Sequence, residues 1–234
     1  MNTSTERNRR LLMLIGAVAT AAAIVVIAVL ASSSGGGSKT PPPKVPIAVT
    51  GGRGPFAGIP QTGPTLGNPK APVTVLEFAD LQCPFCRDFT VNTLPKVVNQ
   101  YVRSGRVKIQ FHNYPFLGHD SITGARAAAA AEQKNRLWDF IDAWYRNQGP
   151  ENSGYATTSF VQKVARQAGL NGPALIAAES SARTKTVLNY DAGQSQRFGV
   201  NSTPTLIVVD SQGRAQGVGD YTQLPAAIAS VLGG

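Results

Sequence analysis

The chain has 234 residues, of which 42% are hydrophobic; this is enough for one globular domain with an accessory segment and too apolar for a disordered tail. Its formal net charge is +9, but residues 71–234 hold 15 basic and 12 acidic side chains, so most of the positive excess lies in the first 70 residues. This distribution favours contact with a membrane surface and does not indicate nucleic-acid binding. Cys83 and Cys86 are the only cysteines, which excludes a scaffold held by several disulfides and a four-cysteine zinc site.

Residues 11–31 form an uncharged apolar run that predicts a transmembrane helix. At 1.5 Å per residue the run spans about 30 Å, the thickness of the hydrocarbon core. Because Arg7, Arg9 and Arg10 precede it, the positive-inside rule predicts that residues 1–10 are cytoplasmic and that the rest of the chain is extracytoplasmic. We therefore expect a single-pass signal anchor in the cell membrane. A signal peptide cleaved after the Val-Leu-Ala sequence is the alternative, and the length of the apolar run disfavours it.

Residues 32–66 are rich in glycine, serine and proline and show no periodic apolar pattern. This composition predicts a flexible linker with a reach of about 30–35 Å. The folded domain is then expected to occupy residues 67–234.

The first part of that domain predicts a strand, a helix and a second strand. Residues 73–78 are β-branched and apolar without polar alternation, which favours a central strand buried on both faces. A helix is predicted to follow and to run to about Tyr101, with an irregularity at Pro95. Residues 107–114 alternate with period two and predict the second strand.

The middle of the domain is predicted to be helical over about residues 118–197, with an interruption at residues 169–173. Strand patterns return at residues 205–209 and again up to Val218, before a last helix at residues 222–232. One helical face carries Leu137, Phe140, Ile141, Trp144 and Tyr145, and Trp138 and Trp144 are predicted to be core residues. The order of elements predicts an α/β domain with an all-helical insertion.

A Cys-Pro-Phe-Cys sequence stands between the predicted buried strand and its helix. A helix N-terminus offers unpaired N–H groups and a partial positive charge, so the thiolate of Cys83 would be stabilised and its pKa lowered. Pro84 suits the first helical position, where a missing N–H costs nothing. Cys86 lies one turn further on and can close a disulfide onto Cys83 as a resolving thiol. Outside the cytoplasm we expect a labile, exposed disulfide as the resting state.

Two other uses of the cysteine pair are open at this point. A purely structural disulfide is disfavoured, because so short a loop constrains the unfolded chain little. A zinc site would combine the pair with His112 and His119, but the six residues between these histidines exceed the usual spacing of three to five. Without such a site both histidines are ordinary strand or loop residues.

Glu77 places a carboxylate inside an otherwise apolar strand. Burying a charge is expensive without a partner, so burial should raise the pKa of Glu77. We favour a proton-relay role beneath Cys86; an edge-facing or salt-bridged Glu77 is the alternative.

Three segments together resemble the DsbA-like branch of the thioredoxin superfamily, membrane-anchored extracytoplasmic thiol-disulfide oxidoreductases. They are VLEFADLQCPFCRDF, the stretch from PFLGH to ARAAAAAEQKNRLWDFIDAWY, and GVNSTPTLIVV. The resemblance runs from about Thr65 to the C-terminus and implies a thioredoxin fold with a helical insertion. It also implies that Cys83 is the attacking cysteine, that Cys86 is its buried partner and that Glu77 is the buried acid that assists proton transfer.

The resemblance further implies a substrate-binding surface around the cysteine pair. Thr203 and Pro204 would match the cis-proline loop, which packs against the disulfide and lends backbone groups to a substrate chain, although sequence alone favours a trans bond. The peptide groove would be bordered by Leu81, Gln82, Pro84 and Phe85.

The function implied is the introduction of disulfide bonds into reduced exported polypeptides, with no cofactor and with reoxidation by a quinone-linked membrane protein of the DsbB or VKOR kind. A reductase or isomerase kept reduced is the alternative, because Phe85 stands where the best-known oxidases carry His and Thr203 where they often carry Val. The best-known isomerases have a separate dimerisation domain, and residues 32–66 are too short and too rich in glycine and proline to form one. An exported module that binds copper or zinc without catalysis is the second alternative.

Overall fold

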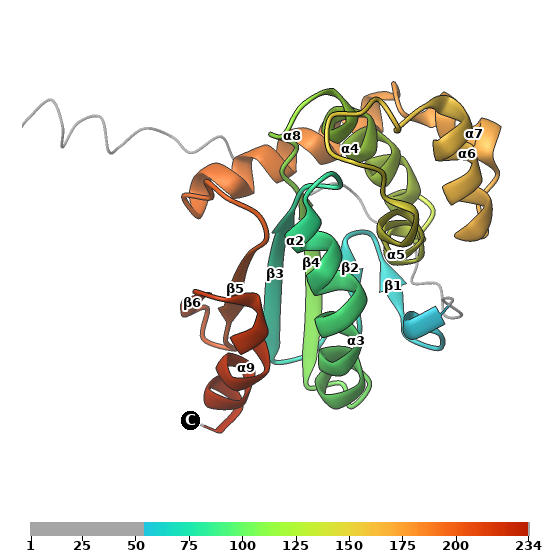
Figure 1. Cartoon of the computed structure of the whole chain (residues 1–234). Helices are drawn as coiled ribbons and strands as arrows, with labels where there is room; N and C mark the ends of the chain where they lie inside the picture. Colours follow the sequence, from blue (N-terminus) through green and yellow to red (C-terminus); the bar gives the residue numbers. More distant parts are fainter. Residues whose placement is uncertain (1–53, 234) are drawn as a thin grey trace, which may run out of the picture. The chain divides into compact units, whose positions relative to one another are not determined.

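The computed structural model describes residues 54–233, and its centre is a mixed sheet of the strand order β1-β2-β4-β3-β5-β6 (Figure 1). In this part of the chain β3 and β4 pair in parallel, and all other neighbours pair antiparallel. The strands are β1 (Gln61–Thr62), β2 (Thr65–Leu66), β3 (Val73–Ala79), β4 (Val107–Asn113), β5 (Thr205–Val209) and β6 (Ala215–Val218). The predicted strands at residues 73–78, 107–114 and 205–209 are thus confirmed.

Strand β3 lies at the centre of the sheet, because β4 and β5 pair with its two edges. Successive side chains of a strand point to opposite faces. Val75 and Ala79 join the larger hydrophobic core, whereas Leu76 and Phe78 join a smaller cluster on the other face. Glu77 shares the face of Val75 and Ala79, so the structure directs its carboxylate into the larger core.

The helix that follows β3 covers this face and is irregular, as predicted near Pro95. Its α-helical parts are α2 (Pro84–Asp88) and α3 (Leu94–Val97), and wider π-helical turns occupy Phe89–Thr93 and Val98–Val102. In the first π turn the N–H of Leu94 donates to the carbonyl of Phe89, five residues earlier. Because Pro95 has no N–H to donate, it stands where the α-helix resumes after that wider turn.

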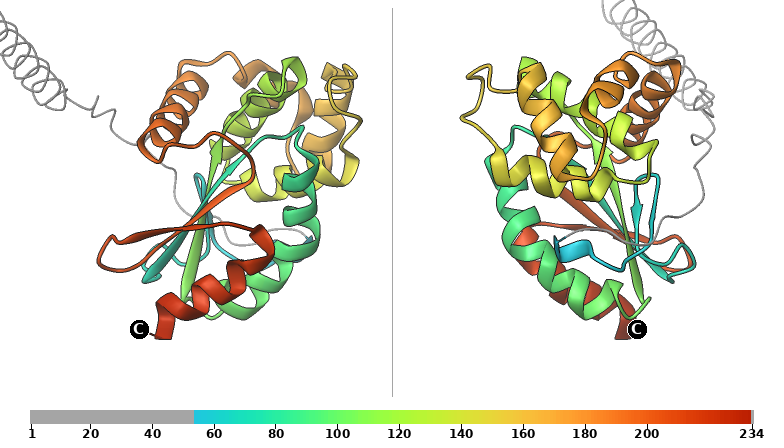
Figure 2. Two further views of the ribbon diagram at one scale, coloured as in Figure 1. Left: turned by 60° about the vertical axis from the view of Figure 1, so that its left-hand side comes forward. Right: turned by 90° about the vertical axis from the view of Figure 1, so that its right-hand side faces the viewer.

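The predicted helical insertion is confirmed. It lies beyond the C-terminal ends of β3 and β4, and Figure 2 shows its helices at that end of the sheet from two further directions. Gly169, with φ +77°, and Asn171, whose side chain caps α7, form the predicted interruption. The helices are α4 (His119–Glu132), α5 (Leu137–Asn147), α6 (Thr158–Gln167), α7 (Gly172–Ala178) and α8 (Ala182–Arg197).

The chain ends on the face that carries α2 and α3. After β6 a short 3-10 helix, Tyr221–Gln223, leads into α9 (Leu224–Gly233). Leu224 and Ile228 of α9 are fully buried in the larger core beside β3 and β5. This confirms the predicted last helix.

The predicted start of the folded domain at residue 67 is wrong. A 3-10 helix at Gly54–Phe56 and strands β1 and β2 already belong to the fold, and Phe56 and Leu66 are fully buried. These residues are held by distant partners: Gly63 N–H donates to Asn135 Oδ1 at 2.8 Å. Such long-range contacts could not be predicted from a glycine- and proline-rich segment, because the residues that make them follow no helix or strand period.

Within residues 54–233 no helix has the length and apolarity needed to cross a bilayer. The predicted cytoplasmic residues 1–10, the predicted transmembrane helix at residues 11–31 and the first part of the predicted linker all lie outside the described residues.

Candidate active site

Cys83 stands at the N-terminus of α2, as the sequence predicts. It is the residue that caps the helix, and its sulfur accepts a hydrogen bond from the N–H of Cys86 at 3.4 Å. Pro84 occupies the first helical position. The thiol of Cys83 in turn donates to the carbonyl of Thr203 at 3.4 Å.

The surroundings of Cys83 lower its pKa to about 6. The largest cause is a hydrogen bond from the side chain of Cys86 to the Cys83 sulfur. Burial acts in the opposite direction, and smaller contributions from the side chain of Thr203 and from the backbone N–H groups of Cys86 and Phe85 add to the stabilisation of the thiolate. At neutral pH the reduced protein therefore carries an ionised Cys83.

Cys86 has the opposite chemistry. It is fully buried in the larger core, and burial raises the pKa of its thiol well above the ordinary value. Hydrogen bonding to the Cys83 sulfur and the charge of Cys83 raise it further. The pair therefore consists of one reactive thiolate and one protonated thiol that acts as its donor.

The structure describes the reduced pair, and it differs from the expectation in the exposure of Cys83. Both cysteines are free, so the geometry is that of the reduced pair. Cys83 is only 3% exposed, because the loop that contains Thr203 lies over its sulfur. The Thr203–Pro204 peptide bond is cis, as the resemblance implies, and places the Thr203 carbonyl beside the sulfur.

Glu77 is fully buried, and neither of its carboxylate oxygens has a hydrogen-bond partner among the described residues. The alternative of an edge-facing or salt-bridged Glu77 is therefore not what the structure shows. Burial raises the pKa of Glu77 to about 8, so the side chain is mostly protonated at neutral pH. Burial raises the pKa of Tyr145, and Cys86 and Glu77 would raise it further when ionised.

The prediction that Gln82 borders the substrate groove is wrong. Its side chain is 1% exposed, and its amide is used within the fold. The Nε2 group donates to Ser121 Oγ at 3.0 Å, and Oε1 accepts the N–H of Asn152 at 2.6 Å. Leu81 is also buried, at 2% exposure. Both residues contact the helical insertion: Gln82 through its side chain and Leu81 through its carbonyl.

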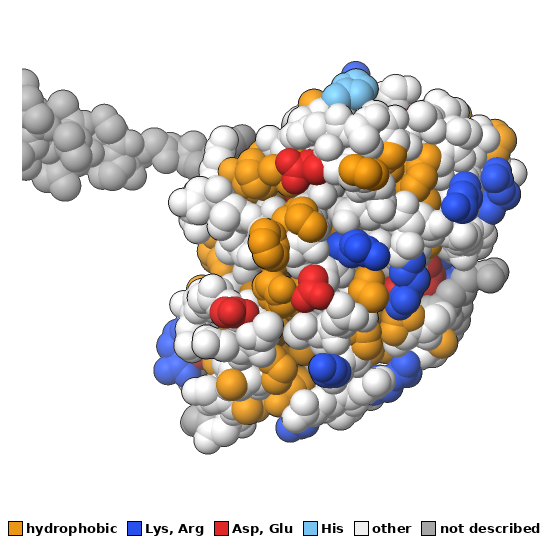
Figure 3. All heavy atoms as spheres, viewed as in Figure 1, with side chains coloured by type: hydrophobic (Ala, Val, Ile, Leu, Met, Phe, Trp, Pro, Cys, Tyr) orange, Lys and Arg blue, Asp and Glu red, His pale blue; other side chains and the backbone are white. Residues whose placement is uncertain are grey.

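Other side chains near the pair are open to solvent. Pro84 is exposed, and Phe85 is 61% exposed. Phe116 and Ile122 are the other large hydrophobic residues exposed in residues 54–233, and both lie near the segment before Cys83. The N–H of Phe116 donates to Asp80 at 2.9 Å, and Ile122 follows the serine that binds Gln82. Figure 3 shows hydrophobic side chains gathered in the middle of the face where Figure 1 places α2.

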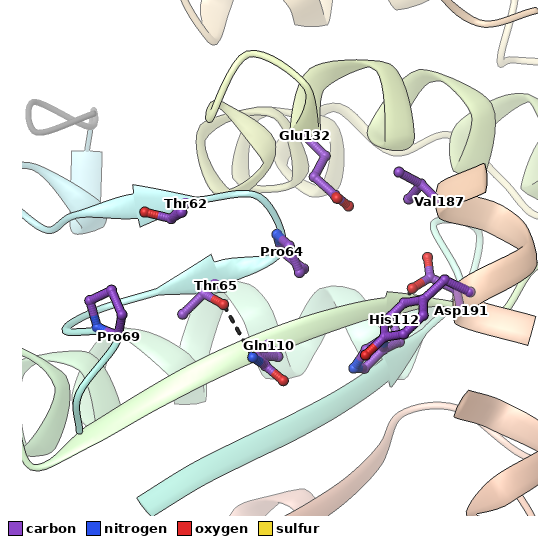
Figure 4. Close-up of a pocket in the computed structure, with 10 residues that line it drawn as sticks. Thr62, Pro64, Thr65, Pro69, Gln110, His112, Glu132, Val187 and Asp191 are labelled. Atoms are coloured by element: carbon purple, nitrogen blue, oxygen red, sulfur yellow. Dashed lines mark hydrogen bonds and ion pairs between the residues drawn. The ribbon is translucent and has the colours of Figure 1, made fainter. Parts of the chain in front are cut away.

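The structure does not bring the two histidines to the cysteines. His112 lies on the opposite face of the sheet, where its ring stacks on Phe78 and its Nδ1 is 3.0 Å from Asp191 Oδ1. There it borders a pocket with Glu132 and Asp191 (Figure 4). His119 is exposed at the start of α4. Among the described residues no three His, Cys, Asp or Glu side chains are placed to share a metal ion.

Sequence reasoning missed a set of residues that hold the segment before Cys83. Asp80 is 1% exposed, and its carboxylate accepts the N–H groups of Gln82, Phe116 and Leu117. Its position three residues before Cys83 was the only available signal. The other members come from the insertion: Trp144, Tyr145, Gln148 and Tyr155. The predicted core role of Trp138 and Trp144 is confirmed, since both are fully buried, but the hydrogen bond of Trp144 to the Leu81 carbonyl had no sequence signal.

Comparison with known proteins gives a consistent set of relatives. A family model described as thioredoxin matches residues 60–225. Disulfide bond formation protein D of Bacillus subtilis is 28% identical over 174 residues, which cover 73% of this chain and 78% of that protein. The probable disulfide bond formation protein D of Bacillus cereus is 36% identical over 109 residues, 46% of this chain. That match spans about half the length of the Bacillus cereus protein, as does the match to its Bacillus anthracis counterpart.

Solved structures support the same fold. The crystal structure of oxidised BdbD from Bacillus subtilis matches with a TM-score of 0.66 and 24% identity, over 81% of this chain and 100% of that one. The crystal structure of Chlamydia trachomatis DsbA matches with a TM-score of 0.62 and 20% identity, over 73% of this chain and 91% of that one. At these identities the likeness concerns the fold, and it confirms the predicted thioredoxin-like architecture with a helical insertion.

Proposed function

The chain belongs to the thioredoxin family, and from that membership and the geometry of the cysteine pair we propose that it introduces disulfide bonds into exported proteins by thiol-disulfide exchange at Cys83 and Cys86. The named relatives in Bacillus are disulfide bond formation proteins, which supports this reaction class. The active form is the one in which the two cysteines are joined as a disulfide.

In the first step a substrate thiolate attacks the sulfur of Cys83. The Cys83–Cys86 bond breaks, its electron pair leaves on Cys86, and a mixed disulfide between substrate and Cys83 forms. In the second step another substrate thiolate attacks the substrate sulfur of the mixed disulfide and releases Cys83 as a thiolate. The substrate has then lost two electrons, and the cysteine pair has gained them.

Glu77 supplies the proton that the leaving Cys86 requires. A buried Cys86 thiolate is unfavourable because burial raises its pKa, so protonation assists the first step. Glu77, with a pKa of about 8, is mostly protonated at neutral pH and lies in the core on the same side of the sheet. On reoxidation Glu77 takes the proton back.

The observation that carries the oxidising direction is the lowered pKa of Cys83, about 6. A stable thiolate is a good leaving group in the second step, and it stabilises the reduced form of the enzyme. A dithiol that is stable when reduced makes its disulfide a strong oxidant.

The partners follow from the proposed reaction. Substrates are reduced exported polypeptides, and the exposed Phe85, Phe116 and Ile122 offer them an apolar surface beside the pair. Each cycle leaves two electrons on the enzyme, so turnover needs an acceptor; we assign this role to a quinone-linked membrane protein of the DsbB or VKOR kind. The apolar run at residues 11–31 would hold the chain in the cell membrane, with residues 1–10 in the cytoplasm and the catalytic domain outside.

The test is the equilibrium reduction potential of the cysteine pair in the full chain, titrated in glutathione buffers. We expect a value of about −120 to −180 mV, in the range of proteins that donate disulfides. A value at or below about −230 mV would contradict the proposed direction, because the protein would then reduce its partners.

A second measurement separates catalysis from metal binding. Cys83→Ser is expected to abolish oxidation of a reduced test protein, and the wild-type chain is expected to be active without bound metal. A protein that is inactive as an oxidant and that loses copper or zinc on Cys86→Ala would instead support the metal-binding alternative.

A further inference from the structure

The backbone that leads into Cys83 is hydrogen-bonded at successive residues by the helical insertion. Tyr145 Oη donates to the carbonyl of Asp80 at 3.1 Å. The carbonyl of Leu81 is 2.8 Å from Trp144 Nε1, 2.9 Å from Gln148 Nε2 and 3.2 Å from Tyr155 Oη, and each of these groups donates to it. We call Trp144, Tyr145, Gln148 and Tyr155 the carbonyl clamp.

Within the carbonyl clamp, Gln148 differs from the other three members. It is the C-cap residue that directly follows α5, and its Nε2 donates both to Leu81 O and, at 3.3 Å, to Cys83 O. It is thus the member of the clamp that reaches the reactive cysteine itself. The carbonyl of Cys83 also accepts the N–H of Arg87 at 3.1 Å, the first hydrogen bond of α2. Gln148 therefore donates a hydrogen bond to Cys83, the N-cap residue at which the loop becomes α2.

We propose that Gln148 is a positioning residue for the cysteine pair, whose amide group fixes the Leu81 and Cys83 carbonyls so that the Cys83 sulfur stays between the N–H of Cys86 and the Thr203 loop. The same NH₂ group is the positive end of an amide dipole, and it lies within hydrogen-bond distance of the Cys83 backbone. Both effects favour the thiolate over the thiol. The inference rests on the proposed function only in that this thiolate is the group the reaction uses.

The role has a physical logic within the fold. The N–H of Cys86 reaches the Cys83 sulfur at 3.4 Å, and the strength of this hydrogen bond depends on an angle that a rotation of the Cys83 backbone would change. A second donor on the Cys83 carbonyl opposes such a rotation. Because that donor comes from the C-cap of α5, the insertion and the cysteine pair are coupled through one side chain.

The experiment compares Gln148→Met, Gln148→Lys and Gln133→Met in the reduced full chain. Methionine keeps the length of the side chain but removes the donors, and lysine restores a donor of positive charge. Gln133 is a matched control: it is also half-buried and also donates to a backbone carbonyl, that of Ala129, but it lies away from the cysteines. The readout is the ultraviolet absorbance of the Cys83 thiolate from pH 3 to pH 9, with Tm measured in parallel.

For Gln148→Met we expect about a threefold lower thiolate fraction at pH 5, consistent with the loss of one modest hydrogen-bonding contribution. Gln148→Lys is expected to restore the wild-type fraction or exceed it, and Gln133→Met to match wild type even if its Tm falls. The inference is overturned if Gln148→Met titrates as wild type, or if Gln148→Lys titrates as Gln148→Met. A wild-type titration typical of an ordinary cysteine would instead count against the proposed function itself.

Discussion

Thr203 acts on Cys83 from the loop that faces it. Its carbonyl accepts the Cys83 thiol at 3.4 Å, and its side chain contributes to the lowered pKa of that thiol. The carbonyl belongs to the backbone and survives substitution, whereas the hydroxyl does not. The position therefore allows one contribution to thiolate stability to be removed while the loop is kept.

We predict that Thr203→Val raises the pKa of Cys83. The Thr203 hydroxyl is buried without a hydrogen-bond partner among the described residues, so it is available to donate to the sulfur once Cys83 is ionised. Loss of that contribution corresponds to about a threefold lower thiolate fraction at pH 5 and to a less oxidising pair. Thiolate absorbance against pH measures the first effect, and a glutathione titration measures the second. Thr205→Val is the control, because the Thr205 hydroxyl donates to Ser202 O at 2.8 Å rather than to the cysteine. Equal titrations of wild type and Thr203→Val would contradict this account.

Glu77 makes the stability of the reduced protein depend on pH in a direction opposite to that of most carboxylates. Its pKa is about 8 in the folded chain and 4.5 as the ordinary value, so between these pH values the folded state holds a proton that the unfolded state has released. Stability from this group is complete below pH 4.5 and is lost as pH rises toward 8.

We predict that Glu77→Gln removes this loss. At pH 4 the variant and wild type should unfold alike, and at pH 7 the variant should be more stable by about 3 kcal/mol, since each pH unit contributes about 1.4 kcal/mol. Urea unfolding of the reduced protein from pH 4 to pH 8 measures the difference. Glu151→Gln, at an exposed position, should follow wild type throughout. The same Glu77→Gln chain should oxidise substrate more slowly, because its amide cannot release a proton to Cys86.

At the scale of elements, the contact between α4 and the segment before Cys83 depends on a glycine. A Cβ on Gly124 would come within 2.9 Å of Leu81 Cβ and 3.1 Å of Trp144 Cζ2, closer than such atoms approach. In α8 a Cβ on Gly193 would meet nothing within 4 Å. The two helical glycines thus differ only in what surrounds them.

We predict opposite signs for the two alanine substitutions. Gly193→Ala should stabilise the fold by about 0.5–1 kcal/mol through helix propensity alone. Gly124→Ala should lose more to overpacking than it gains, for a net cost of about 1–2 kcal/mol, because Leu81 Cβ is tied to backbone and cannot move aside. Chemical denaturation measures both. A stabilised Gly124→Ala would mean that α4 yields easily to the added methyl group.

The elements that could be predicted from sequence are those with a local signal. Strand β3 and the α5 face were clear because β-branched runs and three- or four-residue apolar steps report burial directly. Strands β1 and β2 have two residues each and give no period, and their stability comes from partners far along the chain, such as Trp138 Nε1 donating to Pro64 O at 3.0 Å. The domain start was therefore missed.

The candidate site divides in the same way. Cys83, Cys86 and Glu77 could be placed from a strand, a turn and a helix that are adjacent in sequence. The sequence misplaces Gln82 and gives no signal for Gln148, because the partners of these side chains lie 39 to 70 residues away and polar side chains carry no pattern of burial.

At the scale of the whole molecule, the apolar surface near the cysteines is built by both parts of the fold. Phe85 belongs to α2, Phe116 to the connection after β4, and Ile122 to α4 of the insertion. They are the large hydrophobic residues that residues 54–233 leave exposed. Singly such residues need no explanation; these three are the apolar surface proposed above for substrates, since Phe116 binds Asp80 and Ile122 follows the serine that binds Gln82.

This surface should matter for polypeptide substrates and not for small thiols. Phe116 is 49% exposed, so Phe116→Ser removes apolar area without emptying the core, and the fold should keep its Tm. We predict a KM for a reduced unfolded protein that rises about three- to tenfold, the loss expected when one partly exposed aromatic contact is removed. The rate with glutathione should stay unchanged, because that tripeptide has no apolar side chain to place there. Steady-state oxidation of the two substrates by wild type and Phe116→Ser measures both values; an equal loss with glutathione would mean that Phe116 acts on the cysteine pair rather than on the substrate.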